Sequence, residues 1–213
     1  MPTEFNPLHN RDYTLIVDKS GSMSIRDMPN GKTRWKAAEE STTAIANKVF
    51  EYDSEDGIDV WLFSNTYQCY PNVGPEKVRQ IFKENEPFGG TQMAEVLQKA
   101  LDAYFEKRDS GRLKTNGEMI LVITDGEPDN EKKVVEVLVN GAKRLRSDDN
   151  LAINFIQVGK DESAANFLNY LDEELTQQEG APCDFVETVN MDKIEEVGFQ
   201  QVLMNTVYKT LRV

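Results

Sequence analysis

The chain has 213 residues, with 24 Lys and Arg against 37 Asp and Glu, so its formal net charge is 24 − 37 = −13. This length fits one domain of about 50–250 residues, and we expect residues 1–213 to form a single domain with a loosely ordered N-terminal segment over residues 1–11. Nucleic acid and anionic membrane surfaces are both disfavoured as partners, because they carry the same sign of charge as this chain.

The start of the chain lacks the basic and apolar regions of an export signal, and no stretch approaches the roughly 20 apolar residues of a membrane span. Cys69 and Cys183 are 183 − 69 = 114 positions apart and form no C-x-x-C motif, so they are predicted to be buried thiols. From these features we expect a cytoplasmic protein that is monomeric by itself.

The first half of the chain alternates apolar strands with segments of helical period. Residues 13–17 are short, β-branched and apolar, which predicts a buried strand. From about Thr33 the apolar residues recur at helical spacing. Residues 58–63 predict a second strand, and residues 65–70 predict the returning arm of a short antiparallel hairpin.

The middle of the chain continues the alternation. A short helix is predicted after Pro75, and a longer one after the break at Gly89 and Gly90. Residues 119–124 are a fully apolar strand, and residues 134–145 carry the next helical stripe. This order is typical of strands that are covered by helices.

The last third predicts a strand over 151–158, a helix over 164–175, a strand at 185–186 and a closing helix over 199–211. Continuous apolar strands indicate a sheet buried on both faces, and the helical crossovers make it mostly parallel. The predicted fold class is therefore α/β, a doubly wound, mostly parallel central sheet with helices on both faces. In such sheets, ligands bind outside the carboxyl ends of the strands.

Three loops at that edge carry oxygen ligands. The first strand ends in Asp18, with Ser20 and Ser22 at alternate positions; Thr91 follows a Gly-Gly pair, and Asp125 follows the apolar strand 119–124. These are hard oxygen donors, which suit Mg²⁺ or Mn²⁺, with Ca²⁺ as an alternative. Each loop alone could equally be a turn or a helix cap, but three unrelated turns would rarely share one binding edge.

In order and context, these five positions resemble the metal-ion-dependent adhesion site of the von Willebrand factor type A domain. The resemblance covers nearly the whole chain and implies a Rossmann-like fold in which Asp18, Ser20, Ser22, Thr91 and Asp125 hold one divalent cation, directly or through water. It also implies an open coordination position that accepts an Asp or Glu side chain of a partner protein. Members inside cells often assist ATPases or assembly complexes. The polar stretch 24–33 departs from the family, and the sequence gives it no role.

Among enzymes, a metal-dependent phosphatase of the haloacid-dehalogenase type is the alternative reading. That chemistry needs a second Asp two positions after Asp18 as general acid, and Ser20 stands there. The segment 125–129 does imitate the acidic metal motif of those phosphatases. His9, the only histidine, lies in the N-terminal segment that we expect to be loose. We therefore predict a binding module without intrinsic catalysis.

Overall fold

The computed structural model describes residues 6–52, 57–146 and 150–210. Within them, one six-stranded sheet has the strand order β3-β2-β1-β4-β5-β6. The strands are β1 (Asp12–Asp18), β2 (Ile58–Phe63), β3 (Tyr67–Val73), β4 (Glu118–Thr124), β5 (Leu151–Gln157) and β6 (Val186–Asn190). The α-helices are α1 (Arg34–Tyr52), α2 (Pro75–Glu84), α3 (Met93–Asp109), α4 (Glu131–Arg144), α5 (Glu162–Glu173), α6 (Met191–Val197) and α7 (Phe199–Thr210).

The sheet is parallel except at one edge. β1 pairs with β2 and β4, β4 pairs with β5, and β5 pairs with β6, all in parallel. Only β3 runs antiparallel, as the hairpin arm that follows β2. The predicted α/β class and mostly parallel sheet are confirmed.

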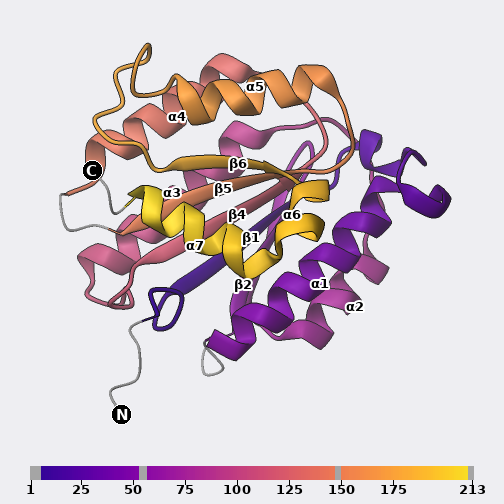
Figure 1. Ribbon diagram of the computed structural model, residues 1–213, viewed down its shortest axis with the longest axis horizontal. Helices are drawn as coiled ribbons and strands as arrows, with labels where there is room; N and C mark the ends of the chain where they lie inside the picture. Colours follow the sequence, from indigo (N-terminus) through magenta and orange to yellow (C-terminus); the bar gives the residue numbers. More distant parts are fainter. Residues whose placement is uncertain (1–5, 53–56, 147–149, 211–213) are drawn as a thin grey trace.

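Helices cover both faces of the sheet (Figure 1). On one face, α1, α2 and α7 pack on alternate strand residues such as Leu15 and Leu121. On the other face, α3, α4 and α5 pack on the intervening residues, such as Ile16 and Ile120. Two cores therefore hold the strands rigidly, and the loops at the carboxyl ends of the strands project from a fixed frame.

Several element ends differ from those predicted. The predicted closing helix is confirmed as α7, with residue 211 outside the described residues, but the helix before it, α6, was not predicted; Gly198, at a left-handed φ of 85°, separates the two. Helix α4 stops one residue short of Leu145, and α5 stops before Leu175, although Leu175 still packs in the core. Cys69 and Cys183 are free thiols as expected, but both are half-buried rather than buried.

The N-terminal segment is not loose over residues 6–11, contrary to expectation. Leu8 and Arg11 are both buried, and the Tyr13 hydroxyl donates to the carbonyl oxygen of Leu8 at 2.8 Å. The Arg11 guanidinium donates to the carbonyl oxygens of Pro7 and Glu118. Apolar burial and these hydrogen bonds fasten this segment to the amino-terminal ends of the strands. Residues 1–5 lie outside the described residues.

A buried carboxylate lies at this amino-terminal edge, far from the candidate metal ligands. Glu118 accepts from the Thr14 hydroxyl at 2.7 Å and from Lys107 Nζ at 3.3 Å. Burial raises the pKa of Glu118, although the Lys107 charge and the Thr14 hydrogen bond oppose the rise. An acid whose folded-state pKa is raised favours folding most when protonated, so its contribution is lost as pH rises through that pKa.

We therefore expect Glu118→Gln to flatten the pH dependence of stability. Wild type should lose more unfolding free energy than the variant between about pH 4 and pH 8, because glutamine has no proton to release. Denaturant unfolding at several pH values measures the difference. Glu86→Gln, at an exposed position, is the control and should leave the profile unchanged. Parallel profiles for wild type and Glu118→Gln would contradict the prediction.

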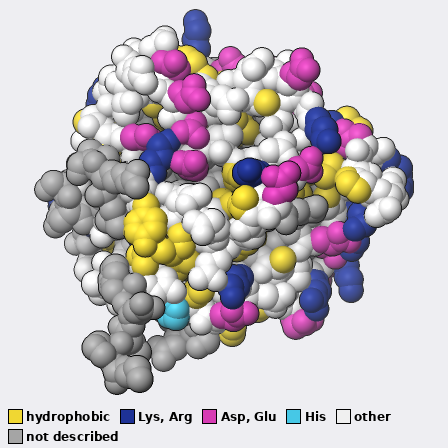
Figure 2. Space-filling view, in the orientation of Figure 1, with side chains coloured by type: hydrophobic (Ala, Val, Ile, Leu, Met, Phe, Trp, Pro, Cys, Tyr) yellow, Lys and Arg dark blue, Asp and Glu magenta, His cyan; other side chains and the backbone are white. Residues whose placement is uncertain are grey.

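The surface is charged but mixed in sign. On the face seen in Figure 2, acidic and basic side chains are interspersed, and apolar side chains form small groups among them. No helix in the described part of the chain combines the length and apolar character needed to cross a bilayer.

Candidate metal centre

Asp18 is the last residue of β1 and is fully buried. Its Oδ1 accepts from the backbone N–H of Ser20 at 2.7 Å, and its Oδ2 accepts from the Thr124 hydroxyl at 2.7 Å. Thr124 ends the neighbouring strand β4, so the parallel pairing of β1 and β4 brings these groups together. The Asp18 carboxylate is thus held in one orientation at the carboxyl edge of the sheet.

The two serine hydroxyls connect Asp18's loop to Asp125. After Asp18 the chain forms a short 3₁₀ turn, Gly21–Ser24. The Ser20 and Ser22 Oγ atoms lie 3.0 Å apart, and Ser22 Oγ donates to Asp125 Oδ1 at 2.8 Å. Loops that are 103 residues apart in sequence therefore present their oxygens to one another.

Thr91 lies on the loop that joins the other two. The backbone N–H of Gly21 donates to the carbonyl oxygen of Gly89 at 3.0 Å, which ties this loop to the first. Thr91 N–H donates to Asp129 Oδ1, and Asp129 N–H donates to the Thr91 carbonyl oxygen, each at 3.0 Å. A Cβ at Gly90 would lie 2.8 Å from Asp129 Oδ2, so a larger residue there would have to displace the Asp129 carboxylate. Thr91 itself is buried.

Without a cation, the carboxyl groups of Asp18 and Asp125 are costly to ionise. Burial, followed by the nearby Asp125 charge, raises the pKa of Asp18 to about 6. Burial also raises the pKa of Asp125, although hydrogen bonds from Arg34 and Ser22 counter the rise. Two buried carboxylates beside uncharged hydroxyls are a donor set that a hard divalent cation would stabilise.

Arg34, which was not among the predicted site residues, touches the site directly. Its Nη1 donates to Asp125 Oδ2 at 2.8 Å, while its Nε and Nη2 make a bidentate pair with Asp27. Arg34 is 8% exposed and Asp125 is fully buried, so the Arg34–Asp125 pair is shielded from water, whereas the Asp27 side chain is 39% exposed. Gly159, at a φ of 80°, permits the approach, since a Cβ there would lie 3.0 Å from Arg34 Nε.

Arg34 also accounts for the polar stretch 24–33, for which no role was predicted. Asp27 comes from this stretch, which contains the 3₁₀ turn Pro29–Gly31 and a bridge between Met28 and Lys32. The Arg34 N–H donates to the carbonyl oxygen of Ile25 at 3.0 Å. The stretch is therefore an ordered loop whose acidic residue balances the arginine.

The charges at the site still suit one dication. Asp18, Asp125 and Asp27 contribute −3 and Arg34 contributes +1, leaving −2. Among the described residues, His, Cys, Asp and Glu nowhere gather in threes as a metal site, so a cation here would depend on the hydroxyls. Hydroxyl and carboxylate oxygens in this number fit Mg²⁺, Mn²⁺ or Ca²⁺ and would not favour a soft metal.

The sequence profile of the von Willebrand factor type A domain matches residues 13–127, which include all five predicted ligands. The chain belongs to the von Willebrand factor type A family. Domains of this family are generally adhesion or interaction modules rather than enzymes, and they often bind proteins in a metal-dependent way. No match was found among curated protein sequences.

Solved structures show the same fold over most of the chain. The manganese-loaded TRAP protein of Plasmodium vivax matches with a TM-score of 0.55 and 19% identity, over 87% of this chain and 70% of that one. Proximal thread matrix protein 1 from the mussel byssus gives 0.56 and 12%, over 93% and 47%. The pilus adhesin SpaC of Lactobacillus rhamnosus GG gives 0.60 and 14%, over 95% and 31%. At these identities the likeness concerns the fold.

The family assignment and the contacts of the site residues both disfavour the phosphatase alternative. The position that would need a general acid is Ser20, whose hydroxyl is engaged with Ser22. Asp129 of the imitating acidic segment accepts from Thr91 N–H and from Gln92 Nε2. His9 precedes β1 and so lies at the opposite edge of the sheet from Asp18, against the Tyr52 ring.

Proposed function

We propose that this domain is a metal-ion-dependent protein interaction module. A divalent cation, Mg²⁺ in the first instance, would be held by Asp18, Ser20, Ser22, Thr91 and Asp125, directly or through water. The observation that carries the proposal is the hydrogen-bonded series from Ser20 through Ser22 to Asp125, beside the buried carboxylate of Asp18.

The open position of such a cation suits a carboxylate of a partner protein. With Asp27 and Arg34 included, a +2 ion brings the site to a formal charge of zero, so the ion remains attractive to one further acidic group. A hollow of about 250 Å³ beside Thr91 is lined by Asp129 and by Lys133, whose ammonium offers a second contact for an acid.

The charge of the whole chain, −13, acts against that partner at long range. We expect association to speed up as salt screens the repulsion over about 8–10 Å, while remaining dependent on metal throughout. An intracellular assembly or ATPase-associated complex in the cytoplasm stays our prediction for the setting, as does a monomeric state of the isolated domain.

Metal binding is the direct test. Titration calorimetry with Mg²⁺ and Mn²⁺ should show one site, and a cation at 100 times its dissociation constant should stabilise the native state by about 2.7 kcal/mol. Asp18→Ala should lose both the heat and the melting shift. Asp102→Asn, on the exposed surface of α3, removes the same charge and should keep both. Absence of heat and of a melting shift in wild type would refute the site.

We also propose that the domain has no hydrolytic activity. The ligand set offers neither a general acid or base nor a nucleophile free of the proposed coordination. Incubation with p-nitrophenyl phosphate and with ATP, in Mg²⁺ or Mn²⁺, should give the uncatalysed rate. Turnover that requires metal and disappears in Asp18→Ala would favour the phosphatase alternative instead.

A further inference from the structure

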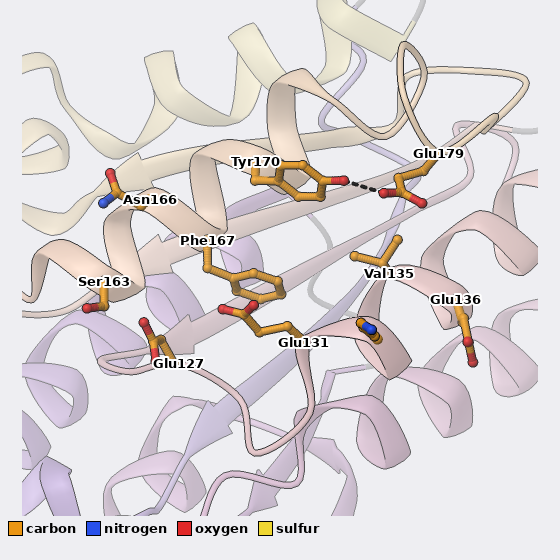
Figure 3. A pocket seen from close by; sticks show the side chains of 10 residues that line it. Glu127, Glu131, Val135, Glu136, Ser163, Asn166, Phe167, Tyr170 and Glu179 are labelled. Carbon is orange, nitrogen blue, oxygen red and sulfur yellow. Dashed lines mark hydrogen bonds between the residues drawn. The ribbon is translucent and has the colours of Figure 1, made fainter.

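A groove of about 690 Å³ lies between α4 and α5 (Figure 3). Its apolar lining includes Phe167, which is 6% exposed, the half-buried Val135 and the ring of Tyr170. Figure 3 shows Tyr170 reaching across to Glu179, whose carboxylate accepts a hydrogen bond from the tyrosine hydroxyl. The groove therefore combines an apolar floor with one end closed by a polar contact.

The rim of the groove is acidic. Glu127, Glu131, Glu136 and Glu179 line it together with a single cation, Lys132, which gives a formal charge of −4 + 1 = −3. Glu127, Glu131 and Glu136 are exposed, and within the described residues their carboxylates make no hydrogen bond or ion pair. These carboxylates are free to pair with cations brought by a ligand.

The dimensions of the groove suit a short peptide. On α5 it extends from Ser163 to Tyr170, eight residues whose seven rises of about 1.5 Å make about 10 Å of helix. That length matches about three residues of extended chain. One end opens at Glu127, two positions after Asp125, so the groove begins beside the candidate metal centre.

We propose that this groove binds a short extended segment of the protein partner, in which an apolar side chain is flanked by Lys or Arg. The apolar side chain contacts Val135 and Phe167, and the flanking cations pair with Glu127, Glu131 and Glu136. Charge complementarity selects this occupant, because a rim of −3 on a chain of −13 attracts basic segments and repels acidic ones.

The inference rests on the proposed function, since it describes the partner that also supplies the carboxylate to the metal. It removes an electrostatic difficulty of that function. An acidic group must approach a chain of −13, and basic residues beside it in the partner would offset the repulsion, so salt should speed association with such a partner less than with one that offers the acidic group alone.

The first experiment tests the groove with a probe of defined chemistry. A fluorescein-labelled pentapeptide, with a central leucine and two basic residues on each side, is titrated by fluorescence anisotropy at low salt in EDTA. Binding should weaken about tenfold in the triple variant Glu127→Gln, Glu131→Gln, Glu136→Gln, because three exposed ion pairs are lost. The matched control, Glu84→Gln, Glu86→Gln, Glu106→Gln, changes the net charge equally and should weaken binding less than twofold.

Further arms separate other occupants of the groove. Val135→Lys, which places a cation on the floor, should abolish binding, and melting scans check that each variant folds. Three results would overturn the proposal: no binding of the basic peptide, equal binding of a peptide with glutamates in place of the basic residues, or equal weakening by both triple variants. Displacement of the peptide by spermine at equal affinity would assign the groove to polyamines, and a dimer abolished by Val135→Lys would assign it to a second copy. Either result would also overturn it.

A second peptide distinguishes this inference from the function on which it rests. It joins the basic pentapeptide to an aspartate through a glycine linker long enough to reach the metal centre. Its affinity should rise at least tenfold with Mn²⁺ over EDTA, and Asp18→Ala should remove that rise while leaving the EDTA affinity unchanged. If the wild-type protein showed no rise in affinity with Mn²⁺ but its affinity still fell with the glutamate substitutions, the metal-bridged function would be wrong and the groove would stand. If the rise were present but the peptide affinity did not respond to the glutamate substitutions, the groove proposal would be wrong.

Discussion

Replacing Arg34 by methionine should lower the free energy of unfolding by about 4 kcal/mol in metal-free buffer. Arg34 is 8% exposed and donates to Asp125, which is fully buried beside Asp18. Methionine fills much of the same space but leaves the Asp125 carboxylate without a countercharge. Removing one partner of a buried ion pair is costly for that reason, even where the intact pair adds little stability.

A divalent cation should restore part of this loss. With Arg34→Met, the site loses a positive charge next to the proposed ion, so Mn²⁺ should stabilise the variant by more than it stabilises wild type. Denaturant unfolding in EDTA and in saturating Mn²⁺ measures both values. If Arg34→Met destabilised the protein equally in the two buffers, the charge of Arg34 would not influence cation binding, and the prediction would be wrong.

Two variants control for the other contacts of Arg34. Asp27→Asn removes the charge of its more exposed partner, whose side chain is 39% exposed, and should cost less than about 1 kcal/mol. Arg34→Lys retains the charge but cannot pair with both carboxylates in the same fork geometry. An intermediate loss is therefore expected for lysine, and a loss equal to that of methionine would show that geometry matters more than charge.

The predicted ligands could be located from the sequence because the fold fixes where strands end. Asp18 ends one apolar strand and Asp125 directly follows another, and in a parallel sheet the carboxyl ends of neighbouring strands share an edge. The structure joins Ser22 to Asp125 and fastens Thr91's loop between them, as that rule requires. Whether these residues hold a cation stays a prediction.

The ion pair of Arg34 could not be read in the same way. Arg34 and Asp125 are 91 residues apart, and the sequence around either residue does not identify the other as its partner. One signal was available: Arg34 lies one turn before Ala38, on the face of α1 that packs against the sheet. A charged residue on an apolar helix face needs a partner when buried, and that could have drawn attention to it.

The element ends that were missed depended on single residues or on long-range contacts. The break at Gly198, which separates the predicted helix α7 from the unpredicted α6, follows from a left-handed φ that glycine adopts without strain, so it was within reach of sequence reasoning. The packing of residues 6–11 was not, because Leu8 and Arg11 are held by groups contributed from β1, β4 and the segment before β5. Composition alone made that segment look loose.

Lys209 on α7 is the cation shared by three acidic residues at the edge of the sheet. Its Nζ donates to Asp172 and to the carbonyl oxygen of Val186, and lies 3.2 Å from Asp184 and 3.5 Å from Glu187. Burial disfavours the charge on Lys209, but the hydrogen bond and charge of Asp172 outweigh it, and the pKa of Lys209 is raised. These contacts join α5, β6 and α7.

Lys209→Met should therefore lower the free energy of unfolding by about 3 kcal/mol at neutral pH, since three part-buried carboxylates lose their only shared cation in the described structure. Burial already raises the pKa of Asp184 and of Glu187, and loss of the lysine raises both further. Acids with raised folded-state pKa values favour folding when protonated, so the loss should shrink as pH falls to about 4.5 and grow as it rises. Denaturant unfolding at neutral pH and at about pH 4.5 measures both losses.

The control is Lys160→Met, which removes one exposed ion pair to Asp192 and should cost less than about 1 kcal/mol at neutral pH. If the loss for Lys209→Met were independent of pH, repulsion among the carboxylates would be excluded as its cause.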